Sequence, residues 1–296
     1  FLESVWILDV PLVFLVELTI QMMYWIYCRR NFTECRYSLR MEKDIFREMF
    51  GFAGWNFLTT CASMLSTQGV SILLNMQFGP VINASRGVAS QINGTVGAFH
   101  RNFTTALNPQ ITKTYAAEDF EYVKRLVCKG AKFSYLAFFF IALPCMIEVN
   151  FFLSVWLKEV PAYAGIFVQL TLLNSLVEVL LNSSETLNRA TGKIRNFQLL
   201  VSSAQFAILI ASYIALKITA NPILVVSMAN IIYLLIFVPR ILVNKPYVGM
   251  TFGYYYKEVL QGVIMMSVIS AALSLLPLMF MSDGWMRLVT VGVVSS

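Results

Sequence analysis

Long apolar blocks separated by short polar connectors make up most of the chain. A helix needs about 20 mostly apolar residues to cross a hydrocarbon core of about 30 Å. Successive blocks reach or approach this length, and the last block runs into the end of the sequence. The pattern predicts an all-α polytopic membrane protein with spans near residues 10–28, 48–75, 81–107, 133–156, 162–187, 197–217, 222–243 and 258–281, and a truncated span at 285–296.

Composition agrees with this pattern, because 58% of the residues are hydrophobic and 13% are charged, against roughly 25% charged residues in an average soluble domain. The net charge is +6, from 22 Lys and Arg residues against 16 Asp and Glu residues, and most of the basic residues lie in every second connector. Basic residues favour the cytoplasmic side of a membrane. The connectors near Arg36, Lys124, Lys193 and Lys245 are therefore expected in the cytoplasm, and the basic surplus indicates orientation and no nucleic-acid partner.

Two of the basic connectors carry more specific expectations. The connector from Asn108 to Lys132 contains AAEDFEYVKRLVCKGAK (116–132), which suits an amphipathic helix that lies at the membrane surface and joins two spans. Arg240, Lys245 and Lys257 are assigned to the connector that follows the seventh span.

Polar residues recur every three or four positions in the neighbouring spans 48–75 and 81–107, so each span presents a polar stripe. One explanation is helix packing through Ser, Thr and Asn, together with an arginine that extends to the interface. The other is a water-filled cavity that receives an anion, because an arginine inside a span needs a carboxylate, a carbonyl or water. The candidate substrate-binding residues are Arg86, Asn83, Asn93, Arg101, Asn56 and Thr67.

Three carboxylates inside predicted spans are candidates for coupling transport to an ion: Glu178, Glu185 and Glu148. Glu185 and Arg189 are four residues apart, so a simple ion pair along one helix also explains Glu185. Glu178 lies near mid-membrane, about 24 Å from the outer end of its span at 1.5 Å per residue. It must be neutralised by a proton, by a cation or by an arginine on another span such as Arg101.

Signatures of soluble enzymes are missing from the sequence. It contains no P-loop, GxSxG, HExxH or nucleotide-binding fingerprint. The five cysteines form no CxxC pair, and His100 is the single histidine, so a Cys/His metal cluster cannot be assembled. We expect no enzyme activity, no catalytic residue, no cofactor and no bound metal.

Several motifs resemble one family of transporters. They are FAGWN (52–56), LLNMQFGPVINASRGVASQINGTV (73–96), LNPQITKTYAAED (107–119), VPAYAGIFVQLTLLNSLVEVL (160–180) and ATGKIRNFQ (190–198). Over about residues 10–245 the chain is similar to polysaccharide and O-antigen flippases, particularly those of Bacteroides-like bacteria. These belong to the multidrug/oligosaccharidyl-lipid/polysaccharide (MATE-like) transporter superfamily. The strings FGPVINASRG and LNPQITK are the specific ones, and Arg86, within the first, matches the family pattern. The pair His100–Arg101 departs from the small and amide residues expected there.

The resemblance implies a MATE-like fold of two six-helix bundles that enclose a central cavity. The chain is then expected to be a fragment. Residues 1–47 would hold the last helix of the first bundle and a cytoplasmic connector. Residues 48–245 would form the second six-helix bundle, and residues 246–296 part of an extra C-terminal pair of helices.

The resemblance also implies a function, the export of an undecaprenyl-diphosphate-linked oligosaccharide for surface polysaccharide or O-antigen. Transport would use alternating access in the bacterial inner (cytoplasmic) membrane. The expected partners are this lipid-linked oligosaccharide, membrane lipids, H⁺ or Na⁺, and polysaccharide-assembly enzymes. The alternatives are a multidrug/cation antiporter of the same superfamily and, in a different class, a membrane glycosyltransferase or polymerase.

Overall fold

The computed structural model describes residues 3–32, 35, 42–280 and 284–294, and the regular structure in these ranges is entirely helical. The chain divides into two compact units, Phe1–Phe50 and Gly51–Ser296, which are described separately. The predicted all-α class is confirmed for the described ranges. Arg36, which marks the first basic connector, lies outside them.

The first unit contains helix α1, Glu3–Asn31, and the first turns of α2, Lys43–Phe78. Leu12–Asn31 is long and apolar enough to cross a membrane. The Arg29 guanidinium lies 5.1 Å from the centre of the Trp25 ring, a cation–π contact at the basic end of the helix.

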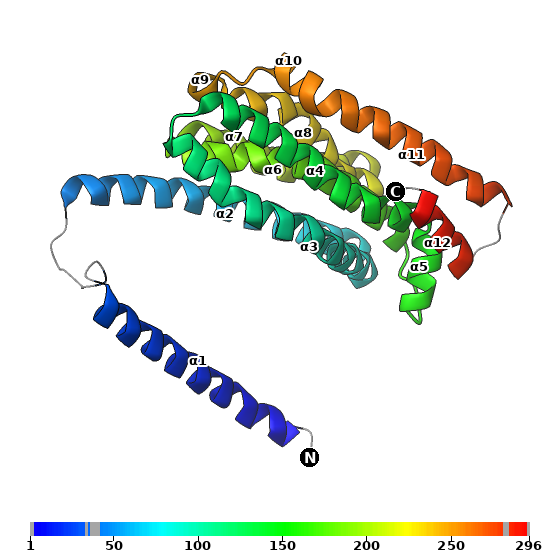
Figure 1. Cartoon of the computed structure of the whole chain (residues 1–296). Coiled ribbons are helices and arrows are strands. Elements are labelled where there is room, and N and C mark those ends of the chain that lie inside the picture. Colours follow the sequence, from blue (N-terminus) through cyan, green and yellow to red (C-terminus); the bar gives the residue numbers. More distant parts are fainter. Residues whose placement is uncertain (1–2, 33–34, 36–41, 281–283, 295–296) are drawn as a thin grey trace. The chain divides into compact units, whose positions relative to one another are not determined.

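The second unit is a bundle of long helices that lie side by side, as Figure 1 shows for α3, α4, α6, α7, α8 and α11. Short helices connect or cap them. Besides the rest of α2, the elements are α3 (Pro80–Ala116), α4 (Phe120–Ile147), α5 (Val149–Trp156), α6 (Ala164–Ala190), α7 (Arg195–Thr219), α8 (Pro222–Leu242), α9 (Lys245–Val248), α10 (Phe252–Tyr255), the π-helical turn η2 (Tyr256–Leu260), α11 (Gln261–Phe280) and α12 (Trp285–Val294).

Seven helical segments in the described ranges are long and apolar enough to span a membrane, which supports a multi-pass membrane protein. They are Leu12–Asn31, Lys43–Phe78, Phe120–Ile147, Ala164–Ala190, Arg195–Thr219, Pro222–Val248 and Phe252–Pro277. The span expected at 81–107 is not among them, because α3 is long but carries the polar stripe that lowers its hydropathy. Helix α3 instead packs closely against α4 and α6 within the bundle.

The prediction of a separate surface helix between Asn108 and Lys132 is wrong, because two long helices occupy this segment. Helix α3 continues to Ala116, and α4 begins at Phe120 after a tight turn in which Glu118 adopts a positive φ of 59°. The Asp119 side chain accepts a hydrogen bond of 3.0 Å from the backbone N–H of Tyr122 and so caps α4. The basic residues from Lys124 to Lys132 therefore lie on the first turns of a spanning helix.

Helix α6 is central to the core, because it packs against α3, α4 and α8. Phe167, Leu172 and Leu187 on α6 are fully buried and belong to one continuous apolar cluster. Gly130 of α4 sits at the closest approach. A Cβ atom there would lie 2.1 Å from a methyl group of Leu107 and 2.8 Å from Ser183 Oγ. Glycine therefore lets α3, α4 and α6 approach closely here, and a larger residue would force the Leu107 and Ser183 side chains to shift.

We predict that the ends of these helices near Lys124, Lys193 and Lys245 face the cytoplasm, because the basic residues concentrate there. Single cysteines placed at these positions, in a variant whose five natural cysteines are replaced, should resist a membrane-impermeant thiol reagent added outside intact cells. Cysteines at Lys158 and Lys217 should react. The reverse labelling pattern would contradict the orientation.

Candidate functional site

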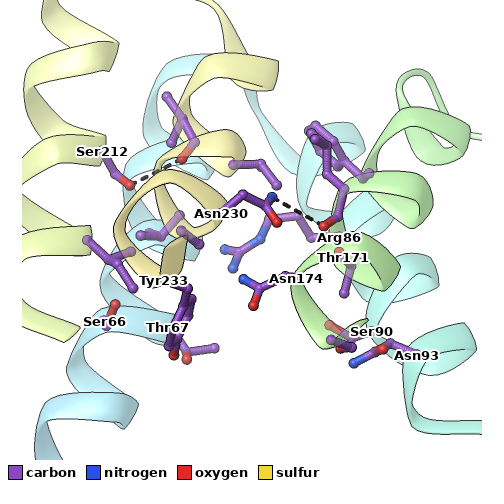
Figure 2. Close-up of a pocket in the computed structure, with 18 of the residues that line it drawn as sticks. Ser66, Thr67, Arg86, Ser90, Asn93, Thr171, Asn174, Ser212, Asn230 and Tyr233 are labelled. Carbon is purple, nitrogen blue, oxygen red and sulfur yellow. Dashed lines mark hydrogen bonds between the residues drawn. The ribbon is translucent and has the colours of Figure 1, made fainter. Parts of the chain in front are cut away.

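A polar cavity of about 280 Å³ lies between helices α2, α3, α6, α7 and α8 of the second unit. Figure 2 shows the Arg86 side chain within it, with Asn174 and Asn230 nearby. Apolar residues such as Phe167 and Ile208 complete the walls. The polar lining residues are Ser66, Thr67, Arg86, Ser90, Asn93, Thr171, Asn174, Ser175, Gln205, Ser212, Asn230 and Tyr233.

Arg86 is the one charged residue in this lining. It lies about 9 Å along α3 from Pro80, at 1.5 Å per residue, and its guanidinium donates a 2.6 Å hydrogen bond to Ser71 Oγ of α2. No carboxylate in the described part of the chain forms an ion pair with Arg86. A half-buried guanidinium that binds only a neutral hydroxyl retains its full positive charge. The cavity is therefore electropositive and suits an anion.

The amide side chains around Arg86 offer hydrogen-bond acceptors. Asn230 donates through Nδ2 to the Leu170 carbonyl at 3.2 Å, and its Oδ1 is buried with no partner among the described residues. The same holds for Oδ1 of Asn93. Buried polar atoms normally have partners, so these two carbonyl oxygens favour a ligand with hydroxyl or water donors. The cavity thus combines an anion-binding fork with acceptors for hydroxyl groups.

The structure brings three of the six predicted substrate residues together, since Thr67, Arg86 and Asn93 all line the cavity. Asn83 and Asn56 are not part of its lining. Asn56 Oδ1 accepts a 2.9 Å hydrogen bond from Gln198 Nε2 of α7, which is the helix-packing role considered for the polar stripes.

Arg101 lies in a separate, shallower depression of about 370 Å³. It shares this depression with Asn108, Glu185 and Arg189, and its guanidinium donates to the Gly94 carbonyl at 2.8 Å. Arg101 and Arg86 therefore do not line one pocket.

Glu178 is paired with Arg240, and this corrects two expectations. The Arg240 guanidinium lies 2.5 Å from Glu178 and 3.5 Å from Glu185, and Glu185 also contacts Arg189 at 2.8 Å. Arg240 is an interhelical residue of α8 with 2% of its side chain exposed, and the assignment to a cytoplasmic connector is wrong. The arginine that neutralises Glu178 comes from another helix, as one alternative required, but it is Arg240 and not Arg101.

Glu148 also has an arginine partner. It lies at the break between α4 and α5, its side chain is 1% exposed, and Arg287 of α12 donates to both carboxylate oxygens at 2.6 Å. Each of the three carboxylates proposed for ion coupling is therefore neutralised by an arginine in this conformation. Coupling through any of them stays a prediction.

The sequence contained a signal for several cavity residues that were not selected. Asn174 and Thr171 precede Glu178 by four and seven residues, so they extend the face of α6 on which Glu178 lies. Asn230 and Tyr233 of α8 are likewise ten and seven residues before Arg240. Extending the helical period from Glu178 by two turns, and from Arg240 by three, reaches these positions.

The described residues contain no group of three or more His, Cys, Asp or Glu side chains that could hold a metal ion. Comparisons with protein-family models, with curated proteins and with solved structures each found no match for this chain. Function is therefore inferred from the cavity, from the placement of charge and from the sequence motifs.

Proposed function

We propose that this chain acts in a flippase for lipid-linked oligosaccharides and that the cavity around Arg86 binds the polar head of the substrate. The observation that carries the proposal is an arginine without a carboxylate partner, inside a polar cavity, in a bundle of membrane-spanning helices. A cation held at this position by the fold is costly in a membrane unless it meets an anion or water.

The chemistry of the lining fits a glycosyl diphosphate. The planar guanidinium of Arg86 can donate two parallel charge-assisted hydrogen bonds to phosphate oxygens. The unpartnered carbonyl oxygens of Asn93 and Asn230 can accept hydrogen bonds from sugar hydroxyls. A cavity of about 280 Å³ is near the lower end of the roughly 300–1,000 Å³ of ligand pockets. It suits the phosphates and the adjoining sugar, and the rest of the glycan would lie outside it.

The arrangement of the helices also suits transport by alternating access. Helices α2, α3, α4, α6, α7 and α8 would correspond to a six-helix MATE-like bundle, and its motion relative to a second bundle would expose the cavity alternately to the two sides. The protein would work in the bacterial inner membrane and serve surface-polysaccharide or O-antigen assembly. If an ion gradient drives export, Glu148, Glu178 and Glu185 would be the coupling sites, each after it separates from its arginine.

The alternatives receive less support from the same geometry. A cation antiporter would need a carboxylate free to bind its substrate, whereas Glu148, Glu178 and Glu185 each contact an arginine. A glycosyltransferase would need a carboxylate or histidine facing the cavity to act as a general base, and the cavity lining contains neither.

Replacing Arg86 with Ala should lower surface-glycan export about tenfold or more, because a hydrogen bond to a charged group contributes about 1.5–3 kcal/mol. Arg86→Lys should be intermediate, since it keeps the charge and loses the fork. The measurement is the amount of surface glycan, together with the build-up of its lipid-linked precursor in the cytoplasmic leaflet.

Ser71→Ala is the matched control, because it removes the hydroxyl that Arg86 contacts and leaves the cation in place. This variant should export nearly as well as the wild type. Normal surface glycan in an Arg86→Ala strain whose membranes contain the usual amount of the protein would refute the proposed role.

A further inference from the structure

A row of basic residues follows one face of α4 at its charged end. Arg125, Lys129 and Lys132 are spaced by four and three residues, so they lie on the same side of the helix. None of them forms an ion pair with a carboxylate in the described ranges, whereas the neighbouring Lys124 is paired with Glu121 at 2.5 Å. Arg125, Lys129 and Lys132 form a basic face of α4, and this basic face carries uncompensated positive charge.

Lys132 fits against a glycine of the neighbouring helix. A Cβ atom at Gly262 of α11 would lie 3.0 Å from Lys132 Nζ and 3.3 Å from its Cε. Glycine at this position therefore lets the ammonium rest against the backbone of α11. Farther along both helices, the hydroxyls of Tyr135 and Ser267 form a 2.9 Å hydrogen bond that fixes α4 and α11 to each other.

The basic face ends where the apolar parts of both helices begin. After Lys132, α4 continues to Ile147 without another charged residue, and α11 has none from Gln261 to Phe280. The uncharged part of α4, residues 133–147, is about 22 Å long at 1.5 Å per residue, and the apolar helix α5 follows it directly along the chain. Lys132 is the last charged residue of α4, so we expect it at the boundary between the polar interface and the hydrocarbon.

The surroundings of this boundary favour an anion. Lys257 of η2 adds another cation to the helix pair. Glu258 is the neighbouring carboxylate on η2, and it is exposed and makes no ion pair with Lys132, Lys129 or Lys257. Beyond the boundary, apolar side chains such as Phe133 and Ile264 are more than half exposed, which suits contact with hydrocarbon chains.

We propose that the basic face, with Gly262 of α11, binds the phosphate of an anionic phospholipid headgroup. Lys132 and Lys129 contact the phosphate, and the acyl chains extend along the uncharged parts of α4 and α11. Clustered cations between helices at a membrane surface are suited to anionic headgroups. The site is separate from the Arg86 cavity, and it holds whether or not the chain moves a lipid-linked glycan.

Native mass spectrometry of the full chain tests this site, with equal amounts of phosphatidylglycerol and phosphatidylcholine that have the same acyl chains. The wild type should retain phosphatidylglycerol preferentially. Lys132→Gln should lower that retention about fivefold, the equivalent of about 1 kcal/mol per lysine at an anionic surface. Gly262→Leu should also lower retention, although it removes no charge, because the added side chain occupies the position of the ammonium.

Lys217→Gln is the matched control, because it removes one charge from an exposed lysine at the other end of the bundle. If Lys217→Gln loses as much phosphatidylglycerol as Lys132→Gln, the lipid is held by general charge attraction, and the proposed site is wrong. Lys129 is exposed, so Lys129→Gln should fold normally, and unchanged retention in it would also overturn the site. If millimolar inorganic phosphate displaces phosphatidylglycerol, the lysines bind free phosphate, and the proposal of a phospholipid site is refuted.

Discussion

Replacing Arg240 with Ala should destabilise the helix bundle by about 3 kcal/mol, near the lower end of the 3–5 kcal/mol typical for breaking a buried ion pair. Arg240 is almost fully buried and lies between Glu178 and Glu185 of α6. Its removal would leave two carboxylates without their shared cation. The lower value is expected because these carboxylates are 32% and 27% exposed. The measurement is the apparent melting temperature of the purified protein, which should fall by about 10 °C.

Arg189→Ala is the matched control for this prediction. Arg189 pairs with the same Glu185, but 51% of its side chain is exposed, and exposed pairs contribute about 0–1 kcal/mol. Its melting temperature should therefore change by no more than about 3 °C. Similar losses in both variants would contradict the view that Arg240 holds α8 to α6.

A variant of Glu178 distinguishes a structural role for this carboxylate from a role in ion coupling. If Glu178 serves only as the partner of Arg240, Glu178→Gln should lower stability while the remaining transport still depends on the ion gradient. If Glu178 takes up a proton or Na⁺ during transport, the variant should keep its substrate affinity and lose that dependence, because Gln is nearly isosteric and cannot titrate. The close contact with Arg240 favours the first result.

The helical architecture could be predicted from the sequence because apolar length is a local property. Most predicted spans fall on long helices. The errors occur where a helix leaves the apolar region without ending. The charges from Lys124 to Lys132 suggested a surface helix, yet only the three residues 117–119 separate α3 from α4. Hydropathy marks the edge of the hydrocarbon, and the helix can continue beyond it.

The candidate site was only partly predictable for a different reason. Arg86 and Asn93 could be found because polar residues repeat along a single helix. The partnership between Glu178 and Arg240 joins residues 62 positions apart, and no periodicity connects them. Arg240 lies two residues before the end of α8, and in the sequence alone a basic residue at such a position indicates membrane orientation. A charged side chain near the end of a span can face the cytoplasm or another helix. For Arg240, only the packing of α6 against α8 distinguishes the two.

Replacing Arg287 with Ala should cause the largest loss of stability, about 3–5 kcal/mol, because it leaves a buried carboxylate without its partner. Glu148 is 1% exposed and receives two 2.6 Å hydrogen bonds from Arg287. Its backbone N–H bonds to the Pro144 carbonyl at the break between α4 and α5, so it cannot easily move to water. The expected result is a fall of about 10 °C or more in melting temperature and a lower amount of protein in the membrane.

The double variant Glu148→Met, Arg287→Met distinguishes an unpaired charge from a loss of packing. Replacing a buried ion pair by apolar residues of similar volume is often neutral or stabilising, so the double variant should recover most of the stability that Arg287→Ala loses. Lys158→Ala, which removes an exposed cation, is the control and should change little. If the double variant is as unstable as Arg287→Ala, the charge of Glu148 is not the cause. Helix α12 would then be held to the bundle by packing, both against α4 and through the edge-to-face contact of Trp285 with Phe151 of α5.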